Sequence, residues 1–310
     1  MKNRLRIFTI VLLSMFLVAS GSNFTFAQDN QNKVKNSATK VAPKKSSAQV
    51  SKGAVEKEKK RVEDIKKKLN ETAIKAVAQT WQVLKLLDNN EKDKALELLK
   101  KVIGELEVVL AANKDISLIP INAYNVIIDP KLSVDGIEKA ISEVKKMLNK
   151  GDIQGARVLL NTLQCEIDIV IENLPLATYP DAMKLASKYL IDGKVAEAKS
   201  VLSVALNSMV IETIVIPLPL VRASGLIKEA SKVAKTDKEQ ALKYLDDAEE
   251  QLRIAQLLGY GNTSPEVYEE LDKKIKDIKK EIKGKNKAEQ MFEELMKKLK
   301  EFKEKLISKK

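Results

Sequence analysis

From about Val55 onward, apolar residues recur at spacings of three and four, which is the pattern of helices that bury one face. The first such stripe ends at Trp81, the only tryptophan, and we expect Trp81 in the core because it continues the stripe. Residues 28–54 are rich in Asn, Gln, Ser and Lys and carry no such pattern over most of their length. They predict a flexible, solvated linker.

An internal repeat follows, in which a helix end, a short polar turn, an alanine and an apolar stripe recur. The alanines are separated by 61, 42 and 43 residues, and each is followed four residues later by a leucine. The pairs are Ala95 and Leu99, Ala156 and Leu160, Ala198 and Leu202, and Ala241 and Leu245. Each unit predicts a helical hairpin, in which the alanine permits close helix packing and Gly151 or Gly193 supplies a left-handed turn residue. The tetratricopeptide signature is missing, so we expect a compact domain rather than an open solenoid.

The segments between the hairpins have a different pattern of residues, at 115–129, 165–180 and 207–220. They are rich in β-branched residues, alternate partly between apolar and polar side chains, and contain prolines. Such segments are typical of short strands, and we expect some of them to pair as a small sheet. The predicted fold class is therefore mainly α, a helical-hairpin repeat domain at residues 55–261 with a small β element.

Residues 262–310 form a separate Lys/Glu-rich region with the pattern of two amphipathic helices. Ser264 is placed to cap the first helix, Pro265 fits its first turn, and the break between the two falls near Gly284. The apolar stripe of the second helix either pairs with another chain as a coiled coil or packs on the body of its own chain.

The N-terminus carries the pattern of a secretory signal peptide at residues 1–27. Basic residues precede an apolar run, Ile7–Ala19, and a small-residue site ends at Ala27, after which we predict cleavage. The alternative is a membrane anchor, but the run is shorter than the ~20 residues that span a bilayer. The expected location is periplasmic.

The 310-residue chain has no histidine and a single cysteine, Cys165, which excludes much chemistry. Without histidine there is no imidazole base or metal ligand, and one cysteine makes neither an intramolecular disulfide nor a zinc ribbon. We therefore expect no catalytic residues, no metal and no cofactor. Cys165 either bridges two chains or is a small buried apolar residue without nearby cations, and the second interpretation is favoured.

The net charge of +12 is unevenly distributed. Residues 28–70 carry +8 and residues 262–310 carry +4, whereas residues 71–261, with 24 basic and 27 acidic residues, carry −3. Export and the excess of lysine over arginine argue against nucleic acid as a partner. Weak contact of the basic ends with anionic membrane surfaces is the most that the charge indicates.

Polar or amphipathic side chains in the turn-rich segments are the candidate ligand-binding residues: Tyr179, Arg222 and Tyr260. In one interpretation they line a pocket, where Arg222 holds an anion and the tyrosines supply apolar faces with a hydroxyl. In the other, favoured interpretation they tie turns to helix ends, with Gly259 and Gly261 forming a turn.

Several strings in these segments resemble the bacterial YfdX family, over roughly residues 70 to 275. They include NLPLATYP at 173–180, VIPLPL at 215–220 and LGYG at 258–261. The resemblance implies a mainly helical, exported, self-associating protein connected with stress responses and drug susceptibility, without established catalysis. It implies no mechanism, and it does not extend to the linker or the C-terminal helices.

These observations lead us to expect a non-enzymatic, homo-oligomeric envelope protein that binds a small molecule or a client protein during stress. The alternative is a chaperone-like or structural scaffold that acts through its C-terminal amphipathic helices. A carboxylate-only enzyme ranks third, because acid/base chemistry needs a desolvated carboxylate that the pattern does not indicate.

Overall fold

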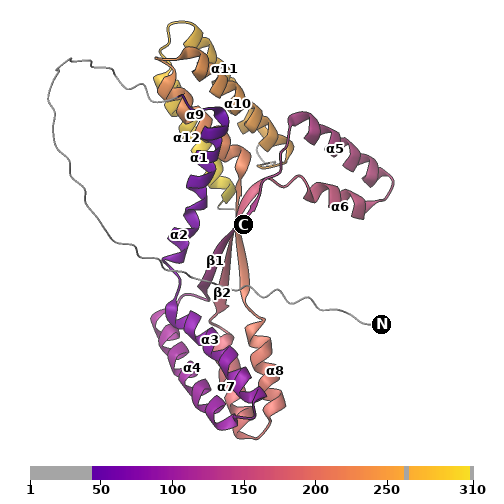
Figure 1. Ribbon diagram of the computed structural model, residues 1–310, viewed down its shortest axis with the longest axis vertical. Coiled ribbons are helices and arrows are strands. Elements are labelled where there is room, and N and C mark those ends of the chain that lie inside the picture. Colours follow the sequence, from indigo (N-terminus) through magenta and orange to yellow (C-terminus); the bar gives the residue numbers. More distant parts are fainter. Residues whose placement is uncertain (1–43, 262–264, 308–310) are drawn as a thin grey trace, which may run out of the picture. The chain divides into compact units, whose positions relative to one another are not determined.

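The computed structural model describes residues 44–261 and 265–307 (Figure 1). The description below concerns the compact unit Lys45–Lys310. The predicted signal peptide, the linker up to residue 43 and the capping residue Ser264 lie outside the described residues.

The protein is mainly helical, which confirms the predicted fold class. None of the described helices is long and apolar enough to cross a membrane. In chain order the helices are α1 (Ser47–Lys59), α2 (Arg61–Lys66), α3 (Glu71–Asp88), α4 (Lys92–Ala112), α5 (Val134–Asn149), α6 (Ile153–Asn161), α7 (Tyr179–Ile191), α8 (Val195–Leu206), α9 (Leu218–Val233), α10 (Lys238–Leu257), α11 (Pro265–Lys283) and α12 (Glu289–Ile307).

The β-branched segments pair as a small antiparallel sheet, as predicted. Its strands in the described part of the chain are β1 (Leu118–Ile128), β2 (Glu166–Pro175) and β3 (Val210–Pro217), with β2 in the middle. The alternation along β2 places Ile167 and Ile169 on a fully buried face. This face packs against α1 and α2 in one core, and Asn125 of β1 donates a hydrogen bond to the carbonyl of Lys59.

Helical hairpins alternate with these strands along the chain. Hairpin α3–α4 precedes β1, α5–α6 joins β1 to β2, α7–α8 joins β2 to β3, and α9–α10 follows β3. Because neighbouring strands are antiparallel, α3–α4 and α7–α8 lie at one end of the sheet and the other two hairpins lie at the opposite end (Figure 1). The predicted repeat is confirmed: its alanines are all buried, and Gly151 and Gly193 have φ of +78° and +77°.

At the first end of the sheet, the two hairpins pack on each other as a helical bundle. Helix α4 contacts α7, and α3 contacts α8. The repeat residues Ala95, Leu99, Ala198 and Leu202 are fully buried in this core. Burying these side chains is the main source of stability for helices of this length.

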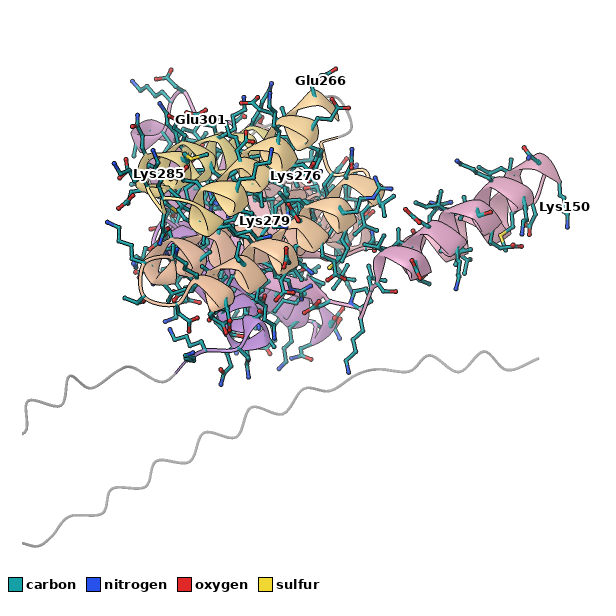
Figure 2. All side chains as sticks on the ribbon, turned by 90° about the horizontal axis from the view of Figure 1, so that it is seen from above. Lys150, Glu266, Lys276, Lys279, Lys285 and Glu301 are labelled. Atoms are coloured by element: carbon teal, nitrogen blue, oxygen red, sulfur yellow. The ribbon has the colours of Figure 1, made fainter. Side chains whose placement is uncertain are left out.

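At the opposite end, hairpin α9–α10 shares a core with α1, α11 and α12. The C-terminal helices are therefore part of the body, and the stripe of α12 packs on its own chain. Phe292, Leu295 and Leu299 of that stripe are buried. Charged residues such as Lys276 and Glu301 stay exposed (Figure 2), while Lys279 binds the carboxylates of Asp246 and Glu249 at 2.5 and 2.8 Å.

The predicted extent of the linker was wrong, because residues 47–54 belong to α1. Ser46 starts this helix with a capping box: its hydroxyl accepts from the backbone N–H of Gln49, and the Gln49 side chain accepts from that of Ser46. Val50 is buried against α9, where the absence of a side chain at Gly225 allows close approach. The polar composition of residues 28–54 gave no indication of this short buried face.

The predicted core position of Trp81 was also wrong, since its side chain is 58% exposed. Asn70 accepts a hydrogen bond from the backbone N–H of Ala73 and starts α3 afresh, which changes the phase of the apolar stripe. The buried face of α3 runs through Ala76, Thr80 and Val83 instead.

Candidate functional site

Two of the three predicted ligand-binding residues meet at the start of β2. The Arg222 guanidinium lies 2.5 Å from the Asp129 carboxylate and 3.8 Å from the Cys165 sulfur. The Tyr260 hydroxyl donates to Glu166 at 2.8 Å and accepts from the backbone N–H of Cys165 at 3.1 Å. These contacts tie the ends of β1, β2, α9 and α10 together.

Cys165 is buried in this cluster, as predicted. Burial raises the pKa of its thiol to about 11, although the nearby Arg222 guanidinium acts in the opposite direction. The sequence predicted that no cation lies near this cysteine, and that was wrong. Arg222 is 57 residues away along the chain but lies beside Cys165 in the fold. The thiol is nevertheless protonated at neutral pH and is a poor nucleophile.

Burial likewise raises the pKa of the Tyr260 hydroxyl, which stays a hydrogen-bond donor to the neighbouring carboxylate. Gly259 and Gly261 have φ of +79° and +73°, so they form the predicted turn on either side of Tyr260. Since Asp129 already neutralises Arg222, this cluster matches the interpretation in which these residues hold turns and helix ends together.

Tyr179, the third candidate, lies beyond the other end of β2 and does not join this cluster. It lines a groove of about 430 Å³ on hairpin α7–α8, with Leu185 and Val204 among its apolar walls. The side chain is almost fully buried, and burial raises its pKa to about 12. Its main role is packing in the bundle core.

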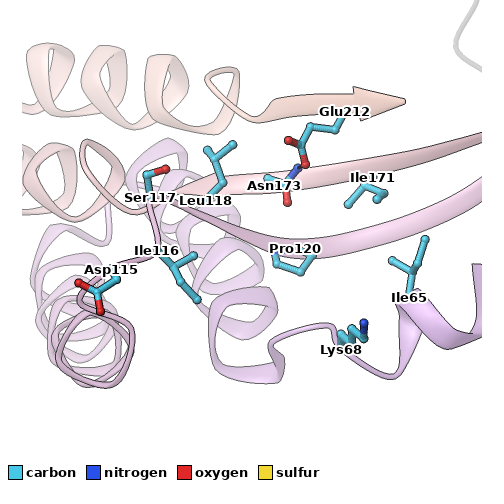
Figure 3. A pocket seen from close by; sticks show the side chains of 10 residues that line it. All are labelled: Ile65, Lys68, Asp115, Ile116, Ser117, Leu118, Pro120, Ile171, Asn173 and Glu212. Carbon is cyan, nitrogen blue, oxygen red and sulfur yellow. Dashed lines mark hydrogen bonds between the residues drawn. The ribbon is translucent and has the colours of Figure 1, made fainter. Parts of the chain in front are cut away.

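A second pocket of about 430 Å³ lies beside the sheet, where α2, the turn before β1 and all three strands meet (Figure 3). Apolar side chains make up half of its lining: Ile65, Ile116, Leu118, Pro120 and Ile171. The polar half consists of Lys68, Asp115, Ser117, Asn173 and Glu212. Apolar walls with a few converging polar groups are typical of a small-molecule site.

Asn173 and Glu212 form the polar floor of this sheet pocket. The Asn173 amide lies beside the Glu212 carboxylate (Figure 3) and donates to it at 2.9 Å. It also donates to the carbonyl of Val210 at 3.4 Å. Asn173 is only 3% exposed, so a buried amide hydrogen-bonds the exposed Glu212 carboxylate. On β1, Pro120 lies opposite Asn173 next to a break in register, and a proline donates no backbone hydrogen bond there.

Sequence reasoning missed this pair, although one signal was present. Ile167, Ile169 and Ile171 occupy alternate positions on one face of β2, and Asn173 continues that face with a polar side chain. A polar residue on a buried face requires a partner. That the partner is Glu212 depends on the register between β2 and β3, which places Ile171 opposite Glu212.

No group of three or more His, Cys, Asp and Glu side chains among residues 44–261 and 265–307 is arranged to hold a metal ion. Lys68 is the single cation lining the sheet pocket, against the carboxylates of Asp115 and Glu212. The lining is therefore slightly acidic. Its chemistry suits recognition of a donor group more than attack on a substrate, since it contains no nucleophile with an adjacent base.

The protein is thus mainly helical, with hairpins that alternate with the strands of a small antiparallel sheet. The sheet pocket lies beside these strands. Residues 76–215 match the family model described as "YfdX protein", which confirms the resemblance over that range. Among solved structures, the chain is similar to one of Salmonella Typhi YfdX, with 18% identity and a TM-score of 0.34. The match covers 48% of this chain and 93% of that one. No curated protein matches the chain.

Proposed function

We propose that the protein is a non-enzymatic binding protein of the bacterial envelope, connected with stress, whose sheet pocket takes a small apolar molecule carrying a protonated amine. The stress connection and the envelope location are supported by the family resemblance and by the signal-peptide pattern of residues 1–27. The binding role is supported by the pocket itself.

The observation that carries the ligand assignment is the Glu212 carboxylate, hydrogen-bonded by Asn173, in a pocket of which half the lining is apolar. One of its oxygens accepts from Asn173, and a carboxylate has further acceptor capacity. An ammonium group forms a charge-assisted hydrogen bond with such an oxygen, while its hydrocarbon body covers Ile171 and Pro120. Asp115 adds a second negative charge to the lining.

The test is calorimetric titration of the intact protein with phenethylamine, compared with phenethyl alcohol, which has the same ring but no charge. We expect saturable binding of the amine and weaker binding of the alcohol. Glu212→Gln should weaken the amine about tenfold, since a hydrogen bond to a charged group contributes roughly 1.5–3 kcal/mol.

Glu172→Gln is the matched control. Glu172 is half-buried on β2, whereas Glu212 is exposed, and it lies next to Asn173 in the chain and therefore faces the other side of the sheet. This variant should bind the amine as the wild type does. Absence of saturable binding, or equal binding of amine and alcohol that Glu212→Gln leaves unchanged, would refute the assignment.

Export has its own test. N-terminal sequencing of the protein recovered from the cell envelope should find a chain that begins at Gln28, after removal of residues 1–27. A chain that retains Met1 would contradict export by cleavage.

Self-association is part of the proposal and is supported by the resemblance. Native mass spectrometry of protein taken from its own envelope would report subunit number together with any bound small molecule. A scaffold that works through the C-terminal helices has less support, because the apolar stripes of α11 and α12 are buried in the core that they share with α9 and α10.

A further inference from the structure

Hairpin α5–α6 exposes large apolar side chains on the surface of the chain. Leu148 is 50% exposed, Ile153 is 64% exposed and Leu160 is 47% exposed. Ile141 is half-buried between them. Leu160 occupies the repeat position at which Leu99, Leu202 and Leu245 are fully buried.

These side chains form one face. Ile141 and Leu148 are seven residues apart on α5, and Ile153 and Leu160 are seven apart on α6, so each pair keeps to one side of its helix. The buried residues Val144 and Ala156 mark the sides on which the two helices meet. Helical geometry places both exposed pairs on the same flank of that contact, and Val158 on the opposite side of α6.

The other hairpins in the described part of the chain bury the corresponding face within the chain. Hairpin α3–α4 packs on α7–α8, and α9–α10 packs on α1, α11 and α12. Among the described residues, the main neighbour of α5 outside its own hairpin is α10, near the start of the helix where Glu138 binds Arg253 at 2.9 Å. The outer part of the hairpin has its apolar face in water, which favours association.

Charges beside this face indicate what covers it. Glu138 and Lys145 lie seven residues apart, at the same edge of the apolar stripe of α5, with Ile141 midway between them. If a second α5 lies antiparallel across the face, with a two-fold axis beside Ile141, each Glu138, which is half exposed and also binds Arg253 of its own chain, meets the Lys145 of the other copy. The surface is thus complementary to itself in the antiparallel orientation, as a two-fold interface requires.

We infer that two copies of this chain associate through their α5–α6 hairpins, antiparallel about a two-fold axis beside Ile141, with their exposed apolar faces packed together. The inference rests on the proposed self-association and names its surface.

The expected dimer is weak. Helices α5 and α6 have 16 and 9 residues and are about 24 Å and 14 Å long, so side by side they offer roughly 400 Å² per copy. A total of roughly 800 Å² lies below the standard size of specific interfaces, which corresponds to a transient dimer with dissociation in the micromolar range or weaker.

The first test measures the mass of the intact protein by light scattering over a range of concentrations. The double substitution Ile153→Asp with Leu160→Asp should raise the dissociation constant at least about tenfold, because it places charges in the centre of the contact. Val158→Asp is the matched control, since Val158 is 67% exposed on the same helix but faces away. It should dimerise as the wild type does, and circular dichroism should show that both variants are folded.

The second test addresses orientation. Lys145→Glu alone should weaken the dimer several-fold by placing two carboxylates opposite each other, and adding Glu138→Lys should restore it. Because Glu138→Lys also breaks the pair with Arg253 inside the chain, circular dichroism of the double variant should show that it is folded. A wild type that stays monomeric at about 100 µM would refute both self-association and this surface. An oligomer that the Asp substitutions do not weaken, or that the charge exchange does not restore, would refute the surface or its antiparallel orientation while leaving self-association intact.

Discussion

The hairpins at the two ends of the sheet share one sequence repeat but pack differently. At one end, hairpins α3–α4 and α7–α8 bury their apolar faces on each other. At the other end, α9–α10 packs with α1 and the C-terminal helices, and hairpin α5–α6 keeps an exposed apolar face. The local pattern of turn, alanine and apolar stripe therefore specifies a hairpin, while the partner of that hairpin depends on what the rest of the chain supplies.

The largest expected effect separates Leu202 from Leu160, which hold the same position in the repeat. Leu202→Ala removes a fully buried side chain from the bundle core and should lower the free energy of unfolding by about 2–5 kcal/mol. Leu160→Ala changes a side chain that is 47% exposed in the single chain and should cost about 0.5 kcal/mol or less when the protein is monomeric.

Urea unfolding at a protein concentration below that of dimer formation provides the measurement. Similar losses for the two variants would mean that α5–α6 is buried within its own chain as deeply as the bundle is, and the contrast between the two ends would fail.

A second expected effect depends on pH and concerns Cys165, at the start of β2. Burial raises the pKa of the native thiol to about 11 from its ordinary value of 9.0, so the native state holds this proton more tightly than the unfolded state. The corresponding stability is present below about pH 9 and is lost as the pH rises towards 11, by about 2–3 kcal/mol.

Cys165→Ala lacks this titration, so the difference in unfolding free energy between wild type and variant should shrink over that interval. A difference that stays constant from about pH 8 to 11 would show that the thiol is not desolvated in the native state.

The smallest contrast compares two glycines of one turn, and it tests whether α12 belongs to the body. Gly259→Ala places a side chain at a φ of +79° with no neighbour within 4 Å, and should cost about 1–2 kcal/mol. Gly261→Ala has a similar φ of +73°, but its Cβ would lie 2.5 Å from the Phe302 ring of α12. We expect a further loss of about 1–3 kcal/mol from this overlap.

Thermal or urea unfolding of the two glycine variants gives that difference directly. Equal losses would indicate that Phe302 does not press on the turn in solution, and that α12 is held less firmly than the shared core implies.

Much of the fold could be predicted because it is specified locally. Alternation predicted the strand segments, and the repeat with its turn glycines predicted the hairpins. Trp81 was misplaced, and the exposure of Leu160 was not predicted, for a different reason. A helical stripe indicates which residues share a face, but the depth of burial depends on the phase reset at Asn70 for α3 and on the missing neighbour for α6.

The candidate site was less accessible to sequence reasoning. Arg222 and Tyr260 both contact Cys165 while Tyr179 lies elsewhere, and Asp129 and Glu166 bind the first two as structural ties. Asn173 and Glu212 come from strands joined by an entire hairpin, so their contact exists only once the sheet register is known. Long-range pairing of this kind is not recorded in spacing along the chain.

Hydrogen exchange measured at two protein concentrations tests most directly whether the exposed hairpin is completed by a second copy. We predict that backbone amides of α5 and α6 exchange quickly in dilute protein and become protected well above the dissociation constant, while those of α3 and α4 are equally protected at both concentrations. Protection of α5 and α6 that is independent of concentration would contradict this account.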